Sequence, residues 1–217
     1  RDLHTAYRRQ RQMCIRDRLR FALCLIENVY VSGTVSGIQQ VGGIGGIFAK
    51  GTVRNCYADV KVIGSSRAGG IVAEPRNAVV VENCFATGTL YSTGNAGGIA
   101  GGLNGNNPTI KGCIAWNEQI DGEPVSGRVI GWQSNTYTKA TDCYAKKDMI
   151  IAWGPNKGMT GADANTAGTY DWGNNKTAIC HGITTENSVD AAKKIGWSTD
   201  IWDLSGVTPL LKSFNDK

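Results

Sequence analysis

The hexapeptide Val81-Glu82-Asn83-Cys84-Phe85-Ala86 decides the fold, because close copies of it recur between residues 25 and 145. The other copies are Ile26-Glu27-Asn28-Val29-Tyr30-Val31, Val53-Arg54-Asn55-Cys56-Tyr57-Ala58, Ile110-Lys111-Gly112-Cys113-Ile114-Ala115 and Ala140-Thr141-Asp142-Cys143-Tyr144-Ala145. Their third residues stand at positions 28, 55, 83, 112 and 142, so successive copies are 27, 28, 29 and 30 residues apart. Self-similarity at a period of about 20 to 50 residues is typical of stacked repeats.

The third residue of each copy predicts a bend in the chain. Asn, Gly and Asp are the residues that best tolerate a left-handed backbone conformation. After the bend, small and large residues alternate, as they do in a half-buried strand. We expect these residues to point inward: Val29 and Val31, Cys56 and Ala58, Cys84 and Ala86, Cys113 and Ala115, Cys143 and Ala145. We expect these to point outward: Tyr30, Tyr57, Phe85, Ile114 and Tyr144, followed by Ser32, Asp59, Thr87, Trp116 and Lys146.

A second motif keeps step with the first and supplies another strand. Its copies are Gly42-Gly43-Ile44, Gly69-Gly70-Ile71, Gly97-Gly98-Ile99 and an altered version at residues 127–131, with Ile44, Ile71, Ile99 and Val129 expected inward. One repeat cannot bury its own apolar face, so the stack is the folding unit. The sequence therefore predicts an all-β, right-handed parallel β-helix of about five coils.

The two ends of the chain differ from the repeats. Residues 7–18 resemble a translated sequencing adapter, so we assign residues 1–20 to an artefact or a tail, the alternative being a basic arm that binds nucleic acid or membrane. The repeats then occupy residues 21–145. Residues 146–217 are Trp-rich and contain one predicted helix, Ser188–Ile195, with Asn187 or Ser188 as N-cap and Gly196 as C-cap. We expect this segment to cap the open strand edges of the stack.

Charge argues against a nucleic-acid partner. The chain carries 23 basic and 18 acidic residues, a net charge of +5. Residues 1–20 hold seven of the Arg and two of the Asp, which leaves 16 basic and 16 acidic residues in the body. We therefore expect no nucleic-acid partner. No apolar run approaches the roughly 18 residues of a membrane span, so no transmembrane segment is expected.

The cysteines predict a structural column. Cys56, Cys84, Cys113 and Cys143 share one inward position, where stacking at about 4.8 Å would permit disulfides. Val29 holds the same position in the first copy, which favours the alternative that these cysteines are small buried apolar groups. There is no C-x-x-C pair, and His181 is the one histidine outside the N-terminal segment, so we expect no metal site and no cofactor.

Residues 81–89 and the pentapeptide Gly97-Gly98-Ile99-Ala100-Gly101 resemble the GLUG-motif repeats of bacterial surface proteins. The resemblance covers roughly residues 25–145, and Gly112 and Arg128 depart from the pattern. Such repeats occur in adhesin-like proteins and beside the N-terminal region of immunoglobulin A peptidases. The resemblance implies an extracellular or cell-surface location and a place within a larger polypeptide.

Three classes of function remain open from the sequence: an enzyme, a binding module and a passive spacer. Parallel β-helices include polysaccharide-degrading enzymes, which need paired carboxylates, but the outward acids Glu27, Asp59, Glu82, Asp121 and Glu123 are scattered over the repeat. We therefore expect no catalytic residues and a non-enzymatic module that binds a glycan or a surface protein; the alternatives are a β-helix polysaccharide-degrading enzyme, a peptidase-associated accessory region and a passive spacer. The candidate ligand-facing aromatics are Tyr30, Tyr57, Phe85 and Tyr144 of the outward column, with Trp116, Trp172 and Trp202. The competing interpretation is that these rings pack on one another or lie under a neighbouring segment.

Overall fold

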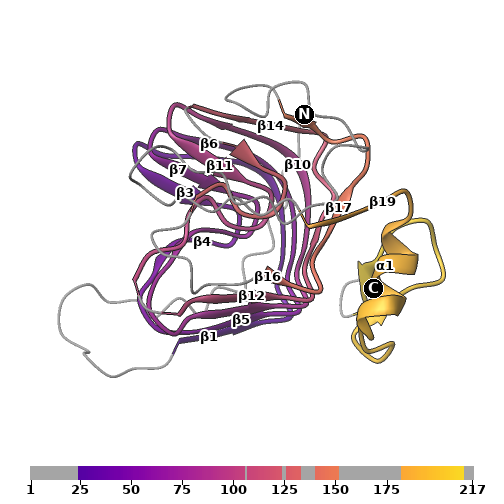
Figure 1. Cartoon of the computed structure of the whole chain (residues 1–217). Coiled ribbons are helices and arrows are strands. Elements are labelled where there is room, and N and C mark those ends of the chain that lie inside the picture. Colours follow the sequence, from indigo (N-terminus) through magenta and orange to yellow (C-terminus); the bar gives the residue numbers. More distant parts are fainter. Residues whose placement is uncertain (1–23, 106, 124–125, 133–139, 152–181, 213–217) are drawn as a thin grey trace, which may run out of the picture.

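The computed structural model describes residues 24–105, 107–123, 126–132, 140–151 and 182–212. In this part of the chain, parallel strands stack rung upon rung into a β-solenoid, with one short helix beside it (Figure 1). The predicted fold class is therefore confirmed. The stack makes about four turns rather than the expected five.

Two parallel sheets carry the hexapeptide repeats. The strands before each bend form sheet A, in the order β1 (Cys24–Glu27), β5 (Gly51–Arg54), β9 (Val80–Glu82), β12 (Thr109–Lys111) and β16 (Ala140–Thr141). The strands after each bend form sheet B: β2 (Tyr30–Ser36), β6 (Tyr57–Gly64), β10 (Phe85–Ser92), β13 (Ile114–Ala115), β14 (Gln119–Gly122), β17 (Tyr144–Lys146), β18 (Ile150–Ile151) and β19 (Ile183–Thr185). Strands β18 and β19 extend this sheet past residue 145, where the sequence-based boundary between repeats and cap was placed.

Two smaller parallel sheets follow, sheet C in four rungs and sheet D in two. Sheet C contains β3 (Gln40–Gly42), β7 (Arg67–Gly69), β11 (Asn95–Gly97) and β15 (Ser126–Gly127). After the Gly-Gly-Ile motif the chain folds back through sheet D, which pairs β4 (Gly45–Phe48) with β8 (Val72–Pro75).

The bend between sheets A and B is made where the sequence predicts it. Asn28, Asn55, Asn83, Gly112 and Asp142 have φ angles of 54°, 52°, 51°, 56° and 51°. This is the left-handed region, which costs other L-residues roughly 1–2 kcal/mol. The repeated Asn, Gly or Asp therefore sets the corner of every rung.

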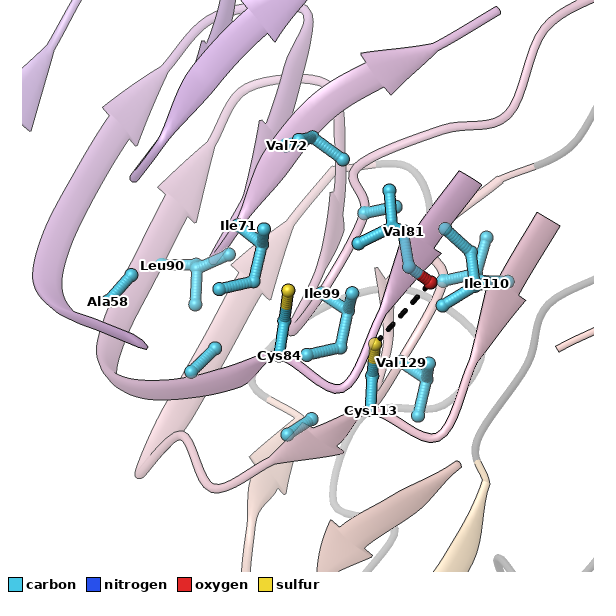
Figure 2. Packing of buried hydrophobic residues seen from close by; sticks show 14 of the residues in the cluster. Ala58, Ile71, Val72, Val81, Cys84, Leu90, Ile99, Ile110, Cys113 and Val129 are labelled. Carbon is cyan, nitrogen blue, oxygen red and sulfur yellow. Dashed lines mark hydrogen bonds between the residues drawn. The ribbon is translucent and has the colours of Figure 1, made fainter. Parts of the chain in front are cut away.

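The four repeated cysteines form one inward column, as expected. Cys56, Cys84 and Cys113 are fully buried, Cys143 is nearly so, and all four are thiols outside any disulfide. Each sulfur donates a weak hydrogen bond to the carbonyl two residues before it, over 3.2 to 3.4 Å. Figure 2 shows two of these thiols among the aliphatic side chains of neighbouring rungs. The cysteines thus act as small core residues rather than as disulfide partners.

The Gly-Gly-Ile motif lets successive rungs pack closely on one another, and it also lets the motif approach sheet B, where Ala86 would lie 2.8 Å from a Cβ on Gly70. Ile71, Ile99 and Val129 fill the core beside the cysteine column (Figure 2). A Cβ added to Gly70 would lie 2.0 Å from the carbonyl oxygen of Gly98, so no side chain fits there. Close packing of this kind explains why glycine recurs at the position.

The C-terminal helix α1 spans Ser188–Ile195, the range predicted from the sequence. Asn187 is the N-cap and accepts hydrogen bonds from the backbone of Val189 and Asp190, while Gly196 ends the helix at φ 86°. The strands β20 (Trp202–Asp203) and β21 (Leu210–Leu211) follow as an antiparallel pair. The sequence predicts that this segment covers the open end of the stack. Strand β19 pairs with the edge of β17, but α1 lies against the outer face of sheet B (Figure 1).

Candidate functional site

The outward column predicted from the sequence lies on sheet B, one residue per rung. The parallel register aligns Tyr30 with Tyr57, Tyr57 with Phe85, Phe85 with Ile114, and Ile114 with Tyr144. The ring centroids of Tyr30 and Tyr57 are 5.0 Å apart, as are those of Tyr57 and Phe85. In-register stacking therefore turns a repeated sequence position into a ladder of rings.

The C-terminal segment covers the middle of this ladder. Trp197 meets the Phe85 ring edge-on at 6.4 Å and stacks on Trp202 at 4.4 Å. Its indole Nε1 donates a 2.9 Å hydrogen bond to the backbone carbonyl of Gly112. Val189, Ala191 and Ala192 of α1 join these residues in a second apolar core outside the solenoid.

This second core explains why the fourth corner is a glycine. A Cβ on Gly112 would lie 2.9 Å from a methyl group of Ile195 and 2.7 Å from the side-chain oxygen of Asn83. Contacts this short force a neighbour to shift. Loss of the corner side chain at this one rung makes room for the helix.

Two of the residues that were predicted to face a ligand are buried where the C-terminal segment covers the column. Phe85 is 0% exposed and Trp202 is 1% exposed, so neither can meet a ligand. Tyr144 and Trp116 are half-buried at the margin of the second core, and Trp172 lies outside the described residues. The interpretation that a neighbouring segment covers the column is correct for Phe85 and Ile114, which are both fully buried in the second core.

Tyr30, Tyr57 and Tyr144 of the column all stay half-exposed, and of these Tyr30 and Tyr57 lie on adjacent rungs. Their phenol rings continue the buried apolar surface beyond Phe85. Two residues further along the same face lie Ser32 and Asp59, both exposed. Burial raises the pKa of Tyr57, which keeps its phenol neutral at physiological pH. The arrangement offers two rings beside hydrogen-bonding groups, a combination that suits binding more than bond cleavage.

A buried carboxylate between sheets C and D forms a second polar cluster. Glu74 is fully buried. Its Oε1 accepts hydrogen bonds from Arg76 Nε at 2.7 Å and Asn104 Nδ2 at 2.8 Å. Its Oε2 accepts from Arg67 Nη1 and, at 3.3 Å, from Gln40 Nε2. The guanidinium of Arg67 also stacks on the ring of Trp132 at 4.5 Å.

This cluster holds the structure together and does not supply an acid catalyst. Burial by itself raises the pKa of Glu74, but hydrogen bonds from Arg76 and Asn104 and the charge of Arg67 outweigh it, so the pKa is lowered. A carboxylate held ionised by two arginines cannot donate a proton at neutral pH. Sequence reasoning missed the cluster because its members come from three different rungs. The one hint was that Glu74 interrupts an otherwise apolar segment.

Two further findings limit the chemistry of the described residues. No three His, Cys, Asp or Glu side chains gather there in a way that could hold a metal ion. Within the same ranges, no helix is long and apolar enough to span a bilayer.

Comparison with known proteins supports the fold. Neither protein-family models nor characterised proteins match the sequence. Among solved structures, the chain is similar to a crystal structure described as a putative immunoglobulin A1 protease from Bacteroides ovatus, with a TM-score of 0.64 and 24% identity. The match covers 87% of this chain and 57% of that one, so this chain spans little more than half of its structural neighbour. The class that fold and comparison define is the parallel β-solenoid.

Proposed function

We propose that this chain is a non-catalytic binding module of a bacterial extracellular or cell-surface protein, built from GLUG-type repeats and part of a larger polypeptide. The observation that carries the proposal is the half-exposed pair Tyr30 and Tyr57, held in register with their ring centroids 5.0 Å apart. Rings of this kind expose both an apolar face and a polar tip, which suits contact with a sugar or with another protein.

The surroundings of the tyrosine pair favour a glycan or a protein surface without strong charge. The hydroxyl of Thr87 donates a 2.7 Å hydrogen bond to Asp59, so a row of polar groups runs beside the rings. The body of the chain, residues 21–217, has equal numbers of basic and acidic residues. Long-range attraction of a highly charged ligand therefore contributes little.

The carboxylate chemistry supports a binding role over hydrolysis. Glycosidases pair an ionised carboxylate with a protonated one of raised pKa. The buried Glu74 is instead kept ionised by Arg67 and Arg76. The exposed Glu27 and the half-buried Glu82 are paired with Arg54 and Lys111 of the next rung.

A glycan array and a pull-down from bacterial and host surface proteins, both with the full chain, test the proposal. Tyr30→Ala and Tyr57→Ala should each weaken binding about fivefold, since one stacked ring contributes about 1 kcal/mol. Tyr91→Ala is the matched control, because Tyr91 is an exposed tyrosine of the same sheet outside the column. Equal loss in the control, or turnover of any polysaccharide or peptide by the purified chain, contradicts the proposal.

A second candidate function is an accessory region of a peptidase. The similarity to the structure described as an immunoglobulin A1 protease favours it. In that case the purified chain binds immunoglobulin A1 without cleaving it, and the tyrosine variants reduce this binding. A chain that binds no glycan and no protein is a spacer. The complete reading frame, with any attached catalytic domain or anchor, distinguishes these cases further.

A further inference from the structure

The outward face of sheet B carries polar side chains in straight rows that cross the rungs. Strands β2, β6 and β10 pair in parallel and in register, so residues at equivalent positions lie side by side. Beside the tyrosine pair, the first row holds Ser32, Asp59 and Thr87, and the second row holds Thr34, Lys61 and Thr89. The members on β2 and β6 are exposed, and those on β10 are half-buried. Each row therefore repeats at the spacing of the rungs, about 4.8 Å.

This spacing matches one kind of ligand, a straight polysaccharide. The ring centroids of Tyr30 and Tyr57, on successive rungs, are 5.0 Å apart. A sugar ring that is linked through equatorial bonds at both ends lengthens the chain by about one ring, which is close to this distance. Chains of this kind, such as cellulose and xylan, are extended. An axial bond turns the chain instead, so a starch-type chain curves away from a flat face.

The side chains of the two rows can form hydrogen bonds with the hydroxyl groups of each sugar unit. Serine and threonine hydroxyls both donate and accept, as sugar hydroxyls do, while the carboxylate of Asp59 accepts and the ammonium of Lys61 donates. The hydroxyl of Thr87 donates to Asp59 at 2.7 Å, which holds this carboxylate in its row. A ligand that crosses the rungs therefore meets two polar groups on each of the three strands.

The charge of this face favours a neutral polysaccharide. Within β2, β6 and β10, Asp59 and Lys61 are the only charged residues, and their charges are opposite. A chain of uronic acids would bring a carboxylate to every rung. Lys61 can pair with only one of these carboxylates, and Asp59 repels them. An uncharged sugar chain avoids this repulsion and still uses both side chains as hydrogen-bond partners.

We propose that the ligand of this module is a neutral polysaccharide with equatorial linkages, which lies along the solenoid axis and places one sugar unit on each rung. The inference rests on the proposed binding function, to which it adds the class of ligand and its direction. A ligand that followed β6 from Tyr57 to Ile63 would meet a ring, an acid, a base and an aliphatic side chain in succession. The regular repeat is found only across the rungs.

Two series of glucose oligomers test the class of ligand, because they differ only in linkage. Cello-oligosaccharides have equatorial linkages, and malto-oligosaccharides have an axial bond at each linkage. In titration calorimetry with the full chain, the affinity for equatorially linked oligomers of glucose, xylose or N-acetylglucosamine should rise about fivefold from disaccharide to trisaccharide, since one more rung adds about one hydrogen bond. Maltotriose should bind at least about tenfold more weakly than the best of these trisaccharides, because it leaves the face after one rung.

Variants on separate rungs test the direction. Ser32→Ala on β2 and Thr87→Val on β10 should each weaken binding of the best equatorially linked tetrasaccharide about fivefold, because each removes a hydrogen-bonding group from a different rung. Thr52→Val is the matched control, since Thr52 is a half-buried threonine of sheet A, and it should leave the affinity unchanged.

The outcomes separate this inference from the proposed function. Equal affinity for the two linkage series, or full affinity in both Ser32→Ala and Thr87→Val, overturns the inference; loss of binding in Tyr57→Ala would then still support a binding module. A chain that binds a protein but none of these oligomers also overturns the inference and leaves the proposed function in place. A chain that binds neither overturns both.

Discussion

Replacement of Glu74 by glutamine tests whether the ion pairs of this buried carboxylate with Arg67 and Arg76 hold strand β8 against sheet C. The carboxylate accepts four hydrogen bonds, two on each oxygen, and all four donors are arginine or amide groups. Glutamine keeps the shape but turns one acceptor into a donor, which then faces two other donors. The variant also leaves the positive charges of Arg67 and Arg76 without their partner.

The size of the effect follows from burial. Removing one partner of a buried ion pair costs about 3–5 kcal/mol. The side chains of Arg67 and Arg76 are 17% and 40% exposed, so both can regain some water in the variant. We therefore expect Glu74→Gln to lower the free energy of unfolding by about 3 kcal/mol, the lower end of this range. With an m-value of about 3 kcal/mol/M, the urea midpoint falls by about 1 M. Glu27→Gln is the control, since the pair of Glu27 with Arg54 is exposed on both sides and should matter little.

The stability that the Glu74 carboxylate contributes should depend on pH. The pKa of Glu74 is lowered by folding, whereas an unfolded glutamate titrates near about 4.3. Above that value the carboxylate contributes its full stability. As the pH falls toward the lower folded pKa, the unfolded state takes up its proton first, and the contribution is lost. The difference in the free energy of unfolding between the original chain and Glu74→Gln, measured with urea, should therefore become smaller below about pH 4. This reasoning would be refuted by a free-energy difference that increases in acid. It would also be refuted if Glu74→Gln lost no more stability than Glu27→Gln.

Three further predictions concern the corner, the thiols and the glycines. Gly112→Asn restores the usual corner residue but overlaps the side chain of Ile195, so that side chain has to move and the packing of α1 should loosen; faster hydrogen exchange in the helix, with the solenoid amides unchanged, would show it. Burial raises the pKa of Cys84, so this thiol should resist alkylation until the chain unfolds; rapid labelling of the native protein would contradict its place in the core. Gly70→Ala puts a Cβ 2.0 Å from the carbonyl oxygen of Gly98, and should lower stability by about 2 kcal/mol or more in denaturant unfolding, since rigid backbone cannot yield cheaply.

The local features of a rung could be predicted from the sequence because each of them repeats. A left-handed corner needs Asn, Gly or Asp, and the chain places one of these every 27 to 30 residues. The alternation after the corner assigns Cys84 inward and Phe85 outward, and both assignments hold. The helix Ser188–Ile195 was predicted because Asn187 and Gly196 mark its ends.

Whether an outward residue meets solvent was decided only by the tertiary structure. Phe85 points outward from the solenoid yet is fully buried, because Trp197 and α1 pack over it. The hydrogen bond that anchors this cover joins Trp197 to Gly112, residues separated by 85 positions. No local periodicity encodes such a contact, and the same holds for Glu74, whose partners Gln40 and Asn104 lie 34 and 30 positions away on other rungs. Repetition determines the conformation of a rung, whereas the exposure of its outer face depends on distant segments that occur once in the chain.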